Sequence, residues 1–185
     1  MRILTVANQL TFLRILAVPA VVLLLLYGYI GWALLVFIGA GLTDALDGVI
    51  ARRANQRTSL GAWLDPMADK LLVVTTFIVL TLPAVEVTNH IPLWLTVLLI
   101  SRDVVIVGVV AVVNLAVGPR TFRPSVLGKA ATATYMLVSL AFLYSNWQQE
   151  RSVAIDIAVY AALVLTIVSS LDYFIRMRRL INEGH

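Results

Sequence analysis

Long apolar runs separated by short polar breaks restrict what this chain can fold into. The breaks are rich in turn formers, charge or interfacial aromatics, and they fall at 27–32, 52–59, 83–92, 118–125 and 145–152. They delimit six segments at about 8–27, 31–53, 58–82, 91–117, 125–146 and 152–176. A hydrocarbon core about 30 Å thick takes about 20 helical residues to cross. The pattern therefore predicts six transmembrane helices.

The balance of residue types agrees with this interpretation. Of the 185 residues, 61% are hydrophobic and 13% are charged, and the mean hydropathy is +0.94. Backbone polar groups in lipid must be satisfied within their own segment, so the runs are expected to be helices. Six spans leave no room for a second domain, so we expect one all-α domain over residues 1–185. The first run lacks a signal-peptide cleavage site and is predicted to be retained.

The positions of Arg and Lys predict the orientation in the membrane. If the N-terminus is cytoplasmic, the outer loops hold only Arg151. The cytoplasmic ends and loops then hold Arg2, Arg52, Arg53, Arg57, Arg120, Arg123, Arg176, Arg178 and Arg179. A net charge of +4 favours contact with anionic lipid. These short loops are too small to form a surface that binds nucleic acid. We expect a multi-pass protein of a bacterial inner membrane.

Four aspartates lie between two very apolar stretches, where charge is costly: Asp44, Asp47, Asp65 and Asp69. Their spacings of three and four place each pair on one face of its helix. A short loop makes the two helices antiparallel, so the four carboxylates converge at the cytoplasmic face. Oxygen ligands without His or Cys select hard cations, and two Mg²⁺ or Mn²⁺ ions would balance the four charges. Such a site suits phosphoryl chemistry.

Two glycines and an arginine beside the aspartates indicate a ligand that carries phosphate. Gly48 and Gly61 lie inside helical segments, where each costs about 1 kcal/mol relative to Ala. They would let a ligand approach the backbone closely. Arg52 could hold a phosphate or a base near the ions. Close packing between helices is the alternative reason for the two glycines.

The stretch from Asp44 to Asp69 reads DxxDGxxAR, then eight residues, then GxxxDxxxD. It resembles the signature of the CDP-alcohol phosphatidyltransferases, and the resemblance runs from "NQLTFLR" (8–14) to "LGKAATATYM" (127–136). Members of that family have six transmembrane helices after a short N-terminal juxtamembrane segment, and they usually form homodimers. They bind CDP-diacylglycerol at a cytoplasm-facing cavity. The resemblance implies this fold and a transfer of the phosphatidyl group to an alcohol with release of CMP.

The resemblance also implies roles for individual residues. The metal-binding acids are matched by Asp44, Asp47, Asp65 and Asp69, and Asp69 matches the residue proposed to deprotonate the acceptor hydroxyl. The positions that accept the cytidine nucleotide are matched by Gly48, Ala51, Arg52 and Gly61. The candidates for contact with acceptor or lipid phosphate are Asn8, Thr11, Arg14, Arg102, Arg120, Arg123, Lys129 and Thr132.

Two acceptor alcohols agree with these stretches. Phosphatidylglycerophosphate synthases use glycerol 3-phosphate, and CMP-forming cardiolipin synthases use phosphatidylglycerol. The former usually carry a second arginine where this chain has Val110, and Lys and Gln where it has Ala131 and Tyr135. Because the phosphatidylglycerophosphate step precedes the cardiolipin step, we expect glycerol 3-phosphate and keep phosphatidylglycerol as the alternative. Arg120 and Arg123 could instead anchor lipid head groups.

Two other classes of protein could place acids in a membrane. A cation transporter would use them as a transit site, but it would leave the glycines near Arg52 unexplained. A non-catalytic lipid-binding or scaffold protein would be unaffected by Asp69→Asn. Release of CMP from CDP-diacylglycerol separates an enzyme from both.

Overall fold

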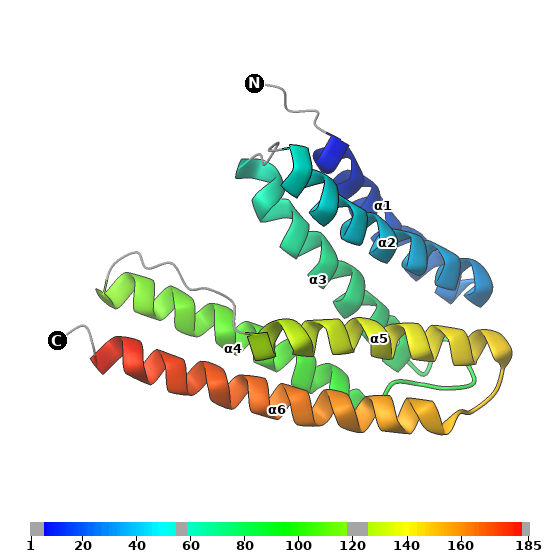
Figure 1. The fold of residues 1–185 in the computed structure, drawn as a ribbon. Coiled ribbons are helices and arrows are strands. Elements are labelled where there is room, and N and C mark those ends of the chain that lie inside the picture. Colours follow the sequence, from blue (N-terminus) through cyan, green and yellow to red (C-terminus); the bar gives the residue numbers. More distant parts are fainter. Residues whose placement is uncertain (1–5, 55–58, 118–125, 183–185) are drawn as a thin grey trace. The chain divides into compact units, whose positions relative to one another are not determined.

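The computed structural model describes residues 6–54, 59–117 and 126–182, which form six α-helices (Figure 1). The helices are α1 (Val6–Leu26), α2 (Ile30–Ala54), α3 (Ser59–Thr81), α4 (Leu93–Val117), α5 (Val126–Gln148) and α6 (Val153–Asn182). Their number and order confirm the all-α prediction.

The last helix is longer than the apolar pattern predicted, since α6 continues past 176 to Asn182. Asp172 and Arg176 form an ion pair at 3.0 Å with i,i+4 spacing, which supports a helix at this point. The residues that follow include good helix formers such as Met177 and Leu180. The end of α6 therefore lies in a polar segment beyond the apolar run, and the apolar pattern could not predict it.

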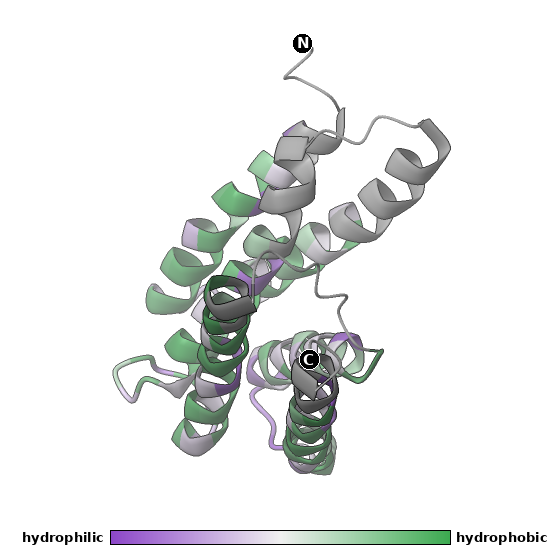
Figure 2. Cartoon of the chain, turned by 90° about the vertical axis from the view of Figure 1, so that its left-hand side faces the viewer, coloured by the Kyte–Doolittle hydropathy of each residue, from purple (hydrophilic) through white to green (hydrophobic). Residues whose placement is uncertain are grey.

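Within the described residues, three helices contain segments that are long and apolar enough to cross a membrane: Leu93–Val112, Val126–Gln148 and Val153–Arg176. The helices α1 and α2 contain shorter apolar stretches, Thr11–Leu26 and Ile30–Thr43. Figure 2 shows that apolar residues cover most of the described helices, as expected for an integral membrane protein. Crossing by all six helices stays a prediction.

The chain forms two compact units. The first unit comprises Met1–Ile91 and Ser139–Arg151, and the second comprises Pro92–Val138 and Ser152–His185. In the first unit, α1 packs against both α2 and α3. Its buried side chains include Val21, Leu25, Phe37, Leu72 and Phe77. In the second unit, α4 packs against α6.

Two buried asparagines fix the segment between α3 and α4 to the end of α5. Asn89 N–H donates to Asn146 Oδ1 at 2.7 Å, and Asn146 Nδ2 donates to the Asn89 carbonyl at 2.9 Å. Asn89 Nδ2 also donates to the Glu150 carbonyl at 2.9 Å. Side-chain amides thus satisfy backbone groups that no helix or sheet satisfies.

Candidate active site

Among the four signature aspartates, Asp69 is the one whose side chain lies in the described part of the chain. It belongs to α3, and its side chain is 25% exposed. Arg14 of α1 contacts it, with Nη1 lying 3.1 Å from Asp69 Oδ1. Arg14 is fully buried, and so is Thr11 on the same helix. Packing of α1 against α3 therefore brings together the proposed base and a cation expected at a phosphate.

The surroundings explain why this ion pair forms. Ala68 and Leu72, on either side of Asp69 in α3, are fully buried, so this face of the helix lies against its neighbours. A buried guanidinium is costly unless a carboxylate compensates its charge. Asp69 supplies that charge to Arg14 across the contact between the two helices.

The other signature residues are described by backbone alone. Asp44, Asp47, Gly48, Ala51 and Arg52 lie in α2, and Gly61 and Asp65 lie in α3. Their side-chain surroundings are outside the described part, as are the side chain of Asn8 and the whole of Arg120 and Arg123. The convergence of the four carboxylates therefore stays a prediction.

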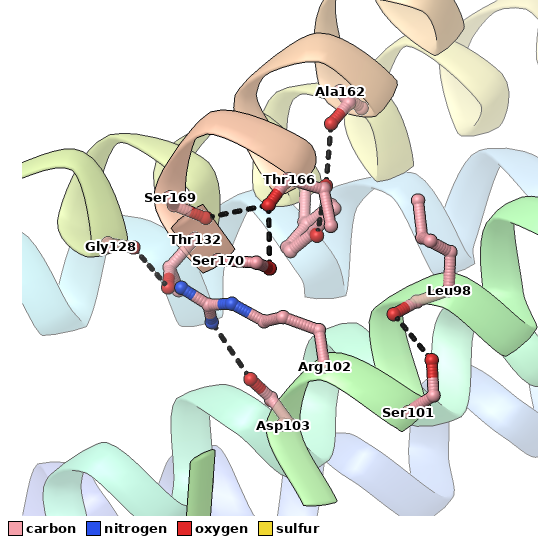
Figure 3. Close-up of polar contacts among 11 residues, drawn as sticks. Leu98, Ser101, Arg102, Asp103, Gly128, Thr132, Ala162, Thr166, Ser169 and Ser170 are labelled. Carbon is pink, nitrogen blue, oxygen red and sulfur yellow. Dashed lines mark hydrogen bonds and ion pairs between the residues drawn. The ribbon is translucent and has the colours of Figure 1, made fainter. Parts of the chain in front are cut away.

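Arg102 is a nearly buried cation of α4, with a side chain that is 8% exposed. Its Nη1 lies 2.8 Å from Asp103 Oδ1. Figure 3 shows the guanidinium directed toward Thr132 of α5 and Ser170 of α6. Its Nε is buried and has no hydrogen-bond partner among the described residues. A buried donor of this kind is suited to a polar or anionic ligand.

Hydroxyl side chains of α5 and α6 lie beside Arg102. Thr132 donates to the Gly128 carbonyl at 3.1 Å, and Ser170 donates to the Thr166 carbonyl at 2.8 Å (Figure 3). Thr166 also shares a hydrogen bond with the hydroxyl of Tyr135. Most of these hydroxyls are therefore already engaged within their own helices, and they give the surroundings of Arg102 a polar character.

The predictions from the sequence did not include several of the polar residues around Arg102. Asp103 directly follows Arg102, and an ionisable residue within an apolar helix was the signal that could have indicated it. Thr166 and Ser170 carry a weaker signal, a spacing that places both hydroxyls on one face of α6. Small hydroxyl residues at that spacing also serve helix packing in membranes, so the sequence alone does not distinguish them.

The expected acceptor residues divide between the two units. Thr11, Arg14 and Asp69 lie in the first unit, and Arg102, Lys129 and Thr132 lie in the second. Lys129 is exposed, while Thr132 is half-buried. Within each unit, the structure supplies a buried arginine next to a carboxylate.

Comparison with known proteins identifies the family. A family model described as CDP-alcohol phosphatidyltransferase matches residues 4–168. The chain is 32% identical over 186 residues to a Mycobacterium tuberculosis protein named "Probable phosphatidylglycerophosphate synthase", with 96% of this chain and 84% of that one covered. It is 37% identical over 151 residues to "Cardiolipin synthase (CMP-forming)" of Streptomyces coelicolor, with 78% and 67% covered. Over 155 residues it is also 37% identical to the Homo sapiens protein of the same name, with 75% and 50% covered.

The matched region includes the whole acidic signature, from Asp44 to Asp69. It also includes α1 through α5 and the first half of α6. The chain therefore belongs to the CDP-alcohol phosphatidyltransferase family of membrane enzymes.

Proposed function

We propose that this phosphatidyltransferase moves the phosphatidyl group of CDP-diacylglycerol to glycerol 3-phosphate and releases CMP. Membership in the family shows the class of reaction, and the identity of the acceptor alcohol is our proposal. The observation that carries it is the alignment along 96% of this chain with a relative named as a phosphatidylglycerophosphate synthase. Relatives named as cardiolipin synthases align over a smaller share of the chain.

The surroundings of Arg102 support a small anionic acceptor. A guanidinium binds phosphate through paired N–H groups, and Arg102 has a buried Nε available in addition to the Nη1 that faces Asp103. Thr132 lies next to it (Figure 3). We infer that Arg102 contacts the acceptor phosphate, with Lys129 as a second cation. Arg120 and Arg123 are proposed for the same phosphate from the sequence alone.

The acidic signature suits the divalent metal on which the family depends. Asp69 offers a carboxylate on a partly exposed side chain, and a donor set without His or Cys fits Mg²⁺ or Mn²⁺. Two such ions, held by Asp44, Asp47, Asp65 and Asp69, would neutralise the charge of the diphosphate. Gly48, Ala51, Arg52 and Gly61 are proposed to receive the cytidine nucleotide.

The chain's own residues then act in a single displacement. Asp69 takes the proton from the acceptor hydroxyl. The acceptor oxygen forms a bond to the phosphorus that carries diacylglycerol. The bond from this phosphorus to the bridging oxygen breaks, and its electron pair leaves with CMP.

The location and assembly are also part of the proposal. The excess of arginine on one set of loops supports an active site that faces the cytoplasm of a bacterial inner membrane. We infer that both compact units belong to one catalytic domain and that two chains form a homodimer, as the family resemblance implies.

Phosphatidylglycerol is the second candidate acceptor. Asp103 offsets part of the charge of Arg102, and the positions that favour Lys and Gln in the other subgroup are the buried Ala131 and Tyr135. An acceptor with one negative charge needs fewer cations than glycerol 3-phosphate. These features are the ones that support phosphatidylglycerol as the alternative acceptor.

One parallel assay tests the acceptor. The purified protein in lipid receives CDP-diacylglycerol and Mn²⁺ together with glycerol 3-phosphate, phosphatidylglycerol or inositol phosphate, and the lipid product is identified by mass. We expect phosphatidylglycerophosphate and free CMP. A product from phosphatidylglycerol alone would replace the proposed acceptor, and metal flux without CMP would favour a cation transporter.

A further inference from the structure

We propose that Arg14 is a positioning residue that holds one oxygen of Asp69, so that the other oxygen faces the acceptor hydroxyl. The inference rests on the proposed role of Asp69 as the base. It gives Arg14 a different task from the direct phosphate contact expected from the sequence.

The first step concerns the two oxygens of the carboxylate. Oδ1 of Asp69 lies 3.1 Å from Arg14 Nη1, and this oxygen is buried. The side chain as a whole is nevertheless 25% exposed. The exposed part therefore excludes Oδ1, and we assign the proton transfer to Oδ2.

The second step concerns access to Arg14. Its side chain is 0% exposed, and it is one of the largest fully buried side chains in the described part. All three guanidinium nitrogens are buried. The guanidinium is thus enclosed by the protein, so a ligand contact is less compatible with this geometry than a contact within the protein.

The third step concerns what the contact restrains. The torsion that turns a carboxylate about its Cβ–Cγ bond is broad, so a free Asp69 would present either oxygen. A charge-assisted contact from a buried arginine on a packed helix limits this rotation. Catalysis is sensitive to such placement, because an error of about 1 Å at a reacting group can cost about 10²-fold in rate.

Kinetics of Arg14→Gln and Arg14→Lys test the proposal, with kcat and the KM for the acceptor measured separately. We expect Arg14→Gln to lower kcat by about 10²-fold, with the acceptor KM and the affinity for CDP unchanged. Lys keeps the charge, so Arg14→Lys should recover part of kcat. A raised acceptor KM with unchanged kcat would show that Arg14 binds the acceptor, and it would overturn the proposal.

Two controls separate the possible failures. Leu25→Ala removes a buried side chain from the same helix and should lower thermal stability without lowering kcat of the folded enzyme. An equal loss of kcat in Leu25→Ala would assign the effect to packing of α1 and overturn the role of Arg14. If Asp69→Asn keeps full activity, the proposed base itself fails. If Asp69→Asn is inactive while Arg14→Gln keeps wild-type kcat, the positioning role alone fails.

Discussion

The hydroxyl groups of Tyr135 and Thr166 hydrogen bond to each other and join α5 to α6 inside the second unit. Both residues are buried, Tyr135 at 3% exposure and Thr166 at 1%. Figure 3 draws Thr166 in one group of polar residues with Arg102. A polar contact between two apolar helices thus lies next to the cation that we assign to the acceptor.

Tyr135→Phe removes this hydrogen bond and leaves the aromatic ring in place. Thr166 keeps its bond to the Ala162 carbonyl at 2.6 Å, so its hydroxyl stays satisfied. We therefore expect a loss of about 1 kcal/mol in the free energy of unfolding, measured by denaturant titration in detergent. An unchanged stability would indicate that water or lipid replaces the lost partner. Thr132→Ser, which keeps a hydroxyl, should show no loss of this size.

Arg102→Gln tests the acceptor site. Loss of a charged hydrogen-bond donor to a phosphate costs about 1.5–3 kcal/mol, so the KM for glycerol 3-phosphate should rise by about 10- to 100-fold. The KM for CDP-diacylglycerol should be unchanged, because Arg102 is assigned to the acceptor alone. Ser101→Ala is the matched control, since Ser101 is exposed and donates only to the Leu98 carbonyl at 3.1 Å. A rise in the KM for CDP-diacylglycerol instead would contradict the assignment.

The helices could be predicted from the sequence because the bilayer fixes both the length of a spanning segment and the polarity of its ends. The expected bounds of α2, near 31 and 53, lie next to those observed, Ile30 and Ala54. The acidic signature stands out in the sequence for a related reason, since charge in a membrane is kept for function, and the roles of its residues stay a prediction. Each of these signals is local, because it depends on residues that lie near one another along the chain.

The pairs Arg14–Asp69 and Tyr135–Thr166 could not be predicted in the same way. Each joins residues on different helices, and which residues meet depends on how one helix is rotated and shifted along the other. Apolar faces in lipid fix that register weakly, since lipid tails are as apolar as the side chains. The sequence therefore marked Arg14 as a candidate site residue but did not predict its contact with Asp69.

Asn146→Ala tests how much the segment between α3 and α4 contributes to stability. The change removes the partners of both the N–H and the carbonyl of Asn89, which are buried. Each buried unsatisfied group costs about 1–3 kcal/mol, so the free energy of unfolding should fall by about 2 kcal/mol or more. Gln148→Ala is the control, because Gln148 bonds to Tyr144 at an exposed site. Equal effects of the two variants would mean that the bonds to Asn89 add nothing beyond surface contacts.

Removal of divalent metal tests the acidic signature as a whole. If Asp44, Asp47, Asp65 and Asp69 hold ions at the diphosphate, EDTA should reduce CMP release to background, since four carboxylates alone would repel the substrate's charge. Mg²⁺ or Mn²⁺ should restore the rate, and Zn²⁺ should restore less, because the site offers oxygen ligands only. Asp65→Asn should raise the Mn²⁺ concentration needed for half-maximal rate, whereas Asp156→Asn, at an exposed residue of α6, should leave it unchanged. Full activity after chelation would remove the metal from the mechanism and leave the acids without their proposed role.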